Sequence, residues 1–193
     1  MADQTVKPMR ADARRNSARI VDVAKQVFVE HGIDAPLDEI VKRAGVGAGT
    51  LYRHFPTRET LMEAVYREEI IQLAELGQRL HDELPPEQAL GAWLHAQLRF
   101  VFANKGLAVS LKAAMDRSGQ TFDYCRTMMR ASGAALLIPL QEAGKVRADL
   151  EPVELLRMTH AVAIATDDDG IERAGVLLDI MLAGLGLPTG PVA

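Results

Sequence analysis

The chain has 193 residues, a formal net charge of −4 and a single cysteine, Cys125. This length corresponds to one large domain or two small ones and is enough to bury a core without metals or disulfides. One cysteine excludes an internal disulfide and a cysteine-rich zinc site, and no apolar stretch approaches the length of a membrane span. The first ten residues lack the apolar core of a signal peptide, so we expect a cytoplasmic protein with no membrane partner.

Charge is unevenly distributed along the chain. Residues 1–60 hold ten Lys or Arg against eight Asp or Glu, whereas the remaining residues hold twelve against eighteen. A protein this acidic overall is not expected to bind nucleic acid along its whole surface. A weakly basic N-terminal end can still contact DNA while the acidic remainder of the chain does not. The pattern favours contact with DNA at the N-terminal end.

Two short helices joined at a glycine are predicted after an amphipathic segment at residues 20–32. The first has apolar residues at i, i+3, i+4 and i+7, which indicates one apolar face: Leu37, Ile40, Val41 and Ala44. Pro36 can serve as its first helical residue, and Gly45 permits the positive φ of a sharp turn. A second helix then begins near Gly47 or Ala48.

The second helix has two different faces. At about 100° per residue, Leu51 and Phe55 point to one side, whereas Gly49 and Arg53 point to the other. The outward face also carries donors for phosphate oxygens and base edges, Thr50 and Tyr52. A helix, a glycine-bearing turn and a second helix form a helix-turn-helix, a unit that docks on DNA. The same spacing also fits a small helical hairpin with a solvated face.

One contiguous run closely resembles the DNA-reading segment of the TetR family of bacterial transcriptional regulators, namely AGVGAGTLYRHFPTRETL at residues 44–61. With the upstream amphipathic segment, the resemblance covers roughly residues 14–66. It implies an all-α fold with a three-helix helix-turn-helix DNA-binding domain, placed at residues 1–60. A C-terminal helical bundle for ligand binding and dimerisation would follow, at residues 61–193.

The resemblance also implies that Thr50, Tyr52, His54 and Arg58 contact phosphates or the groove, and that positions 47–49 and 53 help choose the sequence. The usual capping Ser or Thr and the long basic residue after it are replaced here by Gly47 and Ala48. Ala48 can touch a thymine methyl but cannot donate a hydrogen bond to a base. Arg53 therefore has to supply much of the hydrogen-bonding readout. Direct sequence specificity is therefore expected to be modest.

Five cations precede or begin the first helix: Lys7, Arg10, Arg14, Arg15 and Arg19. Such a segment can reach an adjacent minor groove, or it can be a solvated terminus. Arg14 and Arg15, near the helix start, are the ones expected to contact phosphate. The predicted DNA contacts are therefore Arg14, Arg15, Ala48, Gly49, Thr50, Tyr52, Arg53, His54 and Arg58.

From Thr57 onward the pattern predicts helices and no strand. Thr57 can cap a long helix that ends near Leu84, and Pro86 can start the next one. Pro139 predicts a kink inside its helix. Asp169 to Glu172 has the spacing of a capping box. The next helices are expected at about residues 86–104, 107–116 and 121–143, and Ser118–Gly119 separates the last two of these. Two more helices are expected, one that begins at residue 152 and one that runs from about residue 170 to residues 184–186.

No catalytic or metal site is predicted. Asp167, Asp168 and Asp169 invite a metal hypothesis, but adjacent side chains diverge and no second acidic cluster exists, so a solvated loop is favoured. His160 is a lone imidazole among apolar neighbours and is interpreted as a packing residue. The sequence has no GxSxG, no HExxH and no phosphate-binding glycine loop, so we expect no enzyme and no cofactor.

We predict a ligand-responsive, dimeric transcriptional repressor that a small, mainly apolar effector releases from a near-palindromic operator. One alternative is an architectural or constitutive DNA binder whose bundle only dimerises. Another is a helical-bundle enzyme that handles diphosphates through the aspartates, which would need a second acidic motif.

Aromatic and thioether side chains suit a pocket for a small, mainly apolar effector. The candidate effector residues are Trp93, Gln97, Phe100, Met115, Phe122, Cys125 and Met129.

Dimerisation is expected through the last two helices. The final helix is apolar on more than one side, so it needs a second partner beyond its own core. The resemblance places that partner in another copy of the chain. The stripe expected at the interface comprises Ile171, Ala174, Leu178, Met181 and Leu185.

Overall fold

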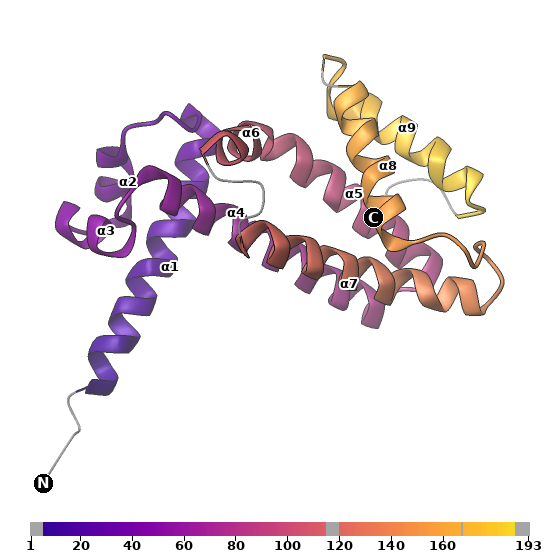
Figure 1. Cartoon of the computed structure of the whole chain (residues 1–193), viewed down its shortest axis with the longest axis horizontal. Helices are drawn as coiled ribbons and strands as arrows, with labels where there is room; N and C mark the ends of the chain where they lie inside the picture. Colours follow the sequence, from indigo (N-terminus) through magenta and orange to yellow (C-terminus); the bar gives the residue numbers. More distant parts are fainter. Residues whose placement is uncertain (1–5, 115–119, 167, 188–193) are drawn as a thin grey trace, which may run out of the picture. The chain divides into compact units, whose positions relative to one another are not determined.

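The structure, a computed structural model, describes residues 6–114, 120–166 and 168–187, and over these ranges it contains helices and no strand (Figure 1). The predicted all-α architecture is confirmed. Helix ends agree with the sequence-based boundaries within a few residues, although the first helix starts earlier than expected. The helices are α1 (Val6–His31), α2 (Leu37–Ala44), α3 (Ala48–His54), α4 (Arg58–Glu83), α5 (Pro86–Ala103), α6 (Lys105–Ala114), α7 (Gln120–Glu142), α8 (Pro152–Ala165) and α9 (Gly170–Gly184).

The chain divides into two compact units. The first comprises residues 1–68 with 106–116, and the second comprises residues 69–105 with 117–193. The sequence places the domain boundary after residue 60, whereas the structure groups the first part of α4 and all of α6 after Lys105 with the N-terminal helices. The predicted break at Ser118–Gly119 lies outside the described residues, as do residues 188–193.

A glycine turn connects α2 to α3 in the first unit. Gly45 has φ 62°, a left-handed conformation that residues with a Cβ rarely adopt. Its N–H donates to Lys42 O, and the N–H of Val46 donates to Val41 O, each at 3.2 Å. This pair of bonds is a Schellman motif. The turn ends α2 and fixes the direction in which α3 leaves it.

The apolar side of α1 holds α2 and α3 in place. Both short helices pack against α1. Ile40 of α2 and Leu51 of α3 have no exposed area. The buried residues of α1 recur at helical spacing, as the amphipathic pattern predicts: Ile20, Ala24, Val27 and Phe28.

Capping groups define two of the later helix starts. Thr60 N donates to Thr57 Oγ1 at 3.3 Å, which confirms Thr57 as the cap of α4. The capping box predicted at Asp169 is wrong, because this side chain makes no capping hydrogen bond to α9. A capping box instead precedes α8, where Glu151 N donates to Glu154 Oε2 at 2.9 Å.

In the second unit, α5 packs against α7, α8 and α9. It can do so because it is apolar on more than one side, a pattern typical of a helix surrounded by others. Eight of its residues are buried: Ala89, Leu90, Gly91, Trp93, Leu94, Ala96, Gln97 and Leu98.

The indole of Trp93 fills the space between α4 and α7 and has no exposed area. Its Nε1–H donates to Leu73 O at 3.0 Å. A Cβ added at Gly77 of α4 would lie 3.0 Å from Nε1, and one added at Gly133 of α7 would lie 3.5 Å from the opposite edge of the ring. Gly77 therefore allows α4 to approach the ring closely, whereas α7 is at a distance that a Cβ would also tolerate.

No helix in the described ranges is long and apolar enough to cross a membrane. Within the same ranges, no three His, Cys, Asp or Glu side chains come together as a metal site. Of the three aspartates considered above, Asp167 lies outside the described residues, and Asp168 and Asp169 are exposed.

Substitution of Gly77 by alanine tests the packing around Trp93. Alanine is normally favoured over glycine in a helix interior by about 1 kcal/mol. Here its Cβ would displace the indole from Leu73 O, so we expect the free energy of unfolding to fall by about 1–3 kcal/mol. Chemical denaturation followed by circular dichroism measures the change.

Gly175→Ala is the matched control, because nothing lies within 4 Å of a Cβ added at that position of α9. This variant should be as stable as the wild type or more stable by up to about 1 kcal/mol. Equal effects of the two substitutions would contradict the packing described for Trp93.

Candidate DNA interface and effector bundle

The exposed side of α3 is the candidate surface for reading DNA. Ala48, Gly49 and Arg53 are exposed, and Tyr52 keeps 51% of its area accessible. Thr50 is half-buried. Gly49 has open space where a Cβ would lie, so no side chain holds the helix backbone away from a partner. Gly49 and Arg53, which the helical repeat predicts to face outward, are therefore exposed, and Thr50 lies at the edge of that face.

The opposite side of α3 anchors it. Leu51 has no exposed area, and Phe55, directly after the helix, is 7% exposed. No side chain caps the helix at Gly47, whose carbonyl accepts from Thr50 N at 2.9 Å and from Leu51 N at 3.2 Å. Helix geometry leaves the N–H groups before these two without an acceptor inside α3, so they are available to phosphate oxygens.

An arginine fork joins the end of α1 to α2. Arg43 Nη1 donates to Glu30 Oε2 at 2.6 Å, and Arg43 Nε donates to Glu39 Oε1 at 2.7 Å. The hydrogen bond from Arg43 lowers the pKa of the Glu39 carboxyl. Arg43 is not among the residues predicted from the sequence, although its spacing of four residues from Glu39 on a predicted helix is a detectable signal.

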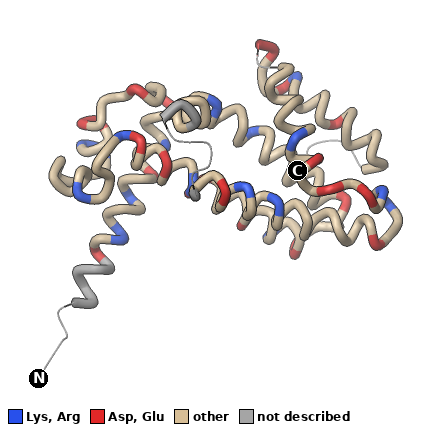
Figure 2. The backbone as a smooth tube through the Cα atoms, in the orientation of Figure 1, with Lys and Arg blue, Asp and Glu red and all other residues tan. Residues whose placement is uncertain are grey.

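The cations predicted to meet DNA have different surroundings. Arg14 and Arg15 are exposed on α1, and Arg15 is paired with Asp12. Basic positions recur along this helix (Figure 2). The helix includes positions 7 and 10, so the predicted N-terminal arm is helical from Val6. Arg58 is half-buried, and its Nη1 donates to two backbone carbonyls, those of Ile33 at 2.7 Å and Ala35 at 2.8 Å.

His54 faces away from the exposed surface more than the resemblance implies. The residue is half-buried, and its Nε2 is buried without a hydrogen-bond partner among the described residues. Its ring lies near that of Phe55, with centroids 6.2 Å apart. In this conformation His54 Nε2 does not point toward a surface that DNA could reach.

Four of the candidate effector residues are buried in the second unit. They are Trp93, Gln97, Cys125 and Met129. Phe100 and Phe122 are half-buried, and Met115 lies outside the described residues. The contacts of Trp93 with Gly77, Gly133 and Leu73 O belong to the chain itself, so its side chain supports the bundle.

Gln97 is the polar exception within this apolar set. The side chain is 6% exposed, and its Nε2 donates to Leu156 O of α8 at 3.4 Å. Its Oε1 is buried and has no hydrogen-bond partner among the described residues. A buried acceptor without a donor costs about 1–3 kcal/mol, so a group that donates to it gains that free energy.

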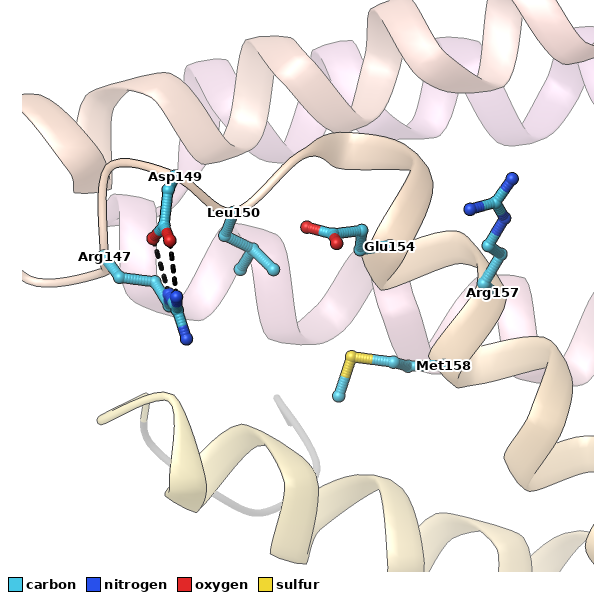
Figure 3. Close-up of a pocket in the computed structure, with 6 residues that line it drawn as sticks. All are labelled: Arg147, Asp149, Leu150, Glu154, Arg157 and Met158. Atoms are coloured by element: carbon cyan, nitrogen blue, oxygen red, sulfur yellow. Dashed lines mark hydrogen bonds and ion pairs between the residues drawn. The ribbon is translucent and has the colours of Figure 1, made fainter.

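A surface hollow of about 390 Å³ lies elsewhere in the second unit (Figure 3). Arg147 and Asp149 form an ion pair at its edge, and both side chains are about two-thirds exposed. A charged, open lining does not suit a mainly apolar effector. None of the candidate effector residues lines it; the lining consists of Arg147, Asp149, Leu150, Glu154, Arg157 and Met158.

The two apolar faces of α9 have different surroundings. Ala174 and Leu178 have no exposed area within a single chain, because they pack into their own bundle. They are therefore unavailable to a second copy, and their predicted place at the interface is corrected. Val176 and Ile180 lie on the opposite face and are 47% and 63% exposed. Of the other predicted positions, Ile171 is 40% exposed, and Met181 and Leu185 are half-buried.

Known proteins resemble both units. Residues 20–65 match the family model of bacterial regulatory proteins of the tetR family. Residues 85–187 match the C-terminal domain of SbtR-like transcriptional regulators. An HTH-type transcriptional regulator of Staphylococcus aureus (strain USA300) is 31% identical over 111 residues, which are 56% of this chain and 60% of the relative. The match thus spans less than two thirds of that relative's length.

Two solved structures match nearly end to end. A TetR transcriptional regulator from Streptomyces coelicolor is 36% identical, covers 90% of this chain and 99% of its own, and has a TM-score of 0.74. A TetR transcription regulatory protein from Mycobacterium vanbaalenii is 32% identical, covers 92% and 99%, and has a TM-score of 0.71. With a helix-turn-helix at one end and the matching C-terminal domain over more than half its length, the chain belongs to the TetR family of bacterial transcriptional regulators, which are DNA-binding proteins and not enzymes.

Proposed function

We propose that this regulator is a dimeric repressor of the cytoplasm that binds a near-palindromic operator and leaves it when a small effector enters the C-terminal bundle. The observation that carries the proposal is the two-sided α3, which is anchored by Leu51 and exposes Gly49, Tyr52 and Arg53. Two copies related by a two-fold axis would present two such helices to major grooves one helical turn, or a multiple of it, apart. The alternative is a constitutive DNA binder whose bundle only dimerises.

Arg53 is the side chain that we expect to read bases. It is exposed on α3, whose first turn offers only Ala48 as a side chain near the bases. An arginine can donate two hydrogen bonds to guanine, whereas a methyl group can only touch thymine. Sequence preference should therefore depend strongly on this one guanidinium.

Substitution of Arg53 by alanine should weaken operator binding by about 1–3 kcal/mol and reduce the preference for operator over random DNA. Fluorescence anisotropy with both duplexes measures the two affinities. Because Arg53 is exposed, the variant should unfold at the wild-type temperature. Equal losses on operator and random DNA would mean that Arg53 contacts only phosphate.

The second copy is proposed to cover the outer face of α8 and α9, which lie side by side (Figure 1). On this face Val176 and Ile180 of α9 and Ile164 of α8 are largely exposed. Few charged positions interrupt the two helices (Figure 2). Four such helices across a two-fold axis would bury an isologous interface, which in stable dimers exceeds about 1,200 Å².

Ile180→Glu should convert the dimer to a monomer, because the carboxylate would be buried without a partner at the interface. The folded monomer should survive, since Ile180 is 63% exposed within one chain. Sedimentation velocity at micromolar concentration distinguishes the two states. The matched control is Ile138→Glu on α7, where 47% of the side chain is exposed and the dimer should persist. A wild-type monomer, or dissociation by both variants, would contradict the proposed face.

The effector is proposed to be mainly apolar with one hydrogen-bond donor, such as a hydroxyl group. Gln97 supports this, because its buried Oε1 lacks a donor while its surroundings on α5 are apolar. A ligand that supplies a donor there regains the free energy of the unmade hydrogen bond. The donor is a chemical feature that composition alone does not predict.

Matched pairs of alkylphenols and alkylbenzenes test the proposed donor in an operator-release assay. On the wild type, the phenols should release operator at concentrations about tenfold or more below those of their hydrocarbon partners. In Gln97→Met this advantage should disappear. Gln88→Met, the same change at an exposed position of α5, should retain it. Release by both classes alike would exclude the role of Gln97, and release by neither class would favour the constitutive DNA binder.

A further inference from the structure

Arg58 is the first residue of α4 and the point at which this helix meets the turn between α1 and α2. Its Nη1 donates to Ile33 O at 2.7 Å and to Ala35 O at 2.8 Å. Both carbonyls belong to the segment that links the two helices, so neither accepts a hydrogen bond inside a helix. The guanidinium supplies charged donors to both of them.

The segment that Arg58 holds determines where α2 begins. Gly32 has φ 79°, and its carbonyl accepts from Ala35 N at 3.2 Å, so the chain turns sharply after α1. Ala35 is 3% exposed, which places the second carbonyl at the edge of the core. Pro36 then leads directly into α2, and α3 follows through the Gly45 turn.

We propose that Arg58 is a positioning residue for DNA binding and not a phosphate contact. By joining α4 to the α1–α2 turn, it keeps α2 and α3 in the orientation that presents the exposed side of α3. Charge-assisted hydrogen bonds are about twice as strong as neutral ones. These two short bonds satisfy Nη1, and the guanidinium cannot turn toward a phosphate without breaking them. Arg53, exposed on α3, carries no such bonds among those described.

The dependence of operator affinity on salt separates the two roles. Each phosphate contact contributes about 0.9 to the slope of log affinity against log salt. In Arg58→Met the aliphatic stem remains and both donors are lost. The affinity should fall by about tenfold at every salt concentration, giving a parallel line with the wild-type slope. The melting temperature without DNA should also fall, whereas Arg53→Met, at an exposed site, should keep the wild-type value.

Two results would overturn the proposal. A slope reduced by about 0.9 would identify Arg58 as a phosphate contact. Wild-type affinity in a variant that is folded but less stable would identify a purely structural residue. If Arg58→Met is unfolded at the assay temperature, Arg58→Lys supplies the measurement, because an ammonium keeps the charge but lacks the planar fork. We then expect a smaller parallel loss, of about two- to fivefold, and unchanged affinity with unchanged slope would refute the positioning role.

Discussion

Close contact between Trp93 and a helical glycine, Gly77, is the constraint on which the C-terminal bundle depends. The indole can lie this close to α4 because Gly77 has no Cβ, whereas a Cβ at Gly133 of α7 would make only ordinary van der Waals contact with the ring. In this position the indole N–H donates to Leu73 O, and the side chain of Trp93 is fully buried. The proposed effector site would therefore lie beside Trp93, and Gln97, one turn further along α5, has a buried oxygen without a donor among the described residues.

Three arginines of the N-terminal unit have different roles because their surroundings differ. Arg43 is held by Glu30 and Glu39 and joins α1 to α2. Arg58 is held by two backbone carbonyls of the turn before α2. Arg53 is exposed on α3. A rigid frame around α3 has a physical benefit, since a helix that is already oriented loses less entropy when it enters a groove.

The sequence predicts the helices well because the signals are local. Gly45 ends α2, Thr57 caps α4 and the proline at position 86 begins α5, and each feature depends on a few neighbouring residues. The outward side of α3 follows from the helical repeat in the same way. Asp169 is the local signal that fails, because the backbone there has helical angles and the carboxylate makes no bond to the helix.

Non-local partners account for what the sequence does not predict. Two turn carbonyls more than twenty residues earlier in the chain decide the role of Arg58, and no spacing rule connects them. The choice of face on α9 is similar, because Leu178 and Ile180 are equally apolar. Only the packing of α9 against α5 and α8 determines that Leu178 is buried and Ile180 exposed. For Trp93, composition suits a pocket and a solid core alike, and its burial follows from non-local contacts with Gly77 and Leu73 O.

The helix α4 contributes to both units, with Arg58 in its first turn and Gly77 near its other end. One continuous helix thus makes the contact that orients the DNA-reading helices and the contact that packs Trp93. An effector that releases DNA must bind one arrangement of these contacts more tightly than the other. To change the ratio of the two arrangements from 1:99 to 99:1, the effector must bind one of them about 5.5 kcal/mol more tightly than the other. One hydrogen bond to Gln97 supplies only a fraction of this, about 1–3 kcal/mol, so most of the difference has to come from apolar surface that the effector buries in one arrangement and not in the other.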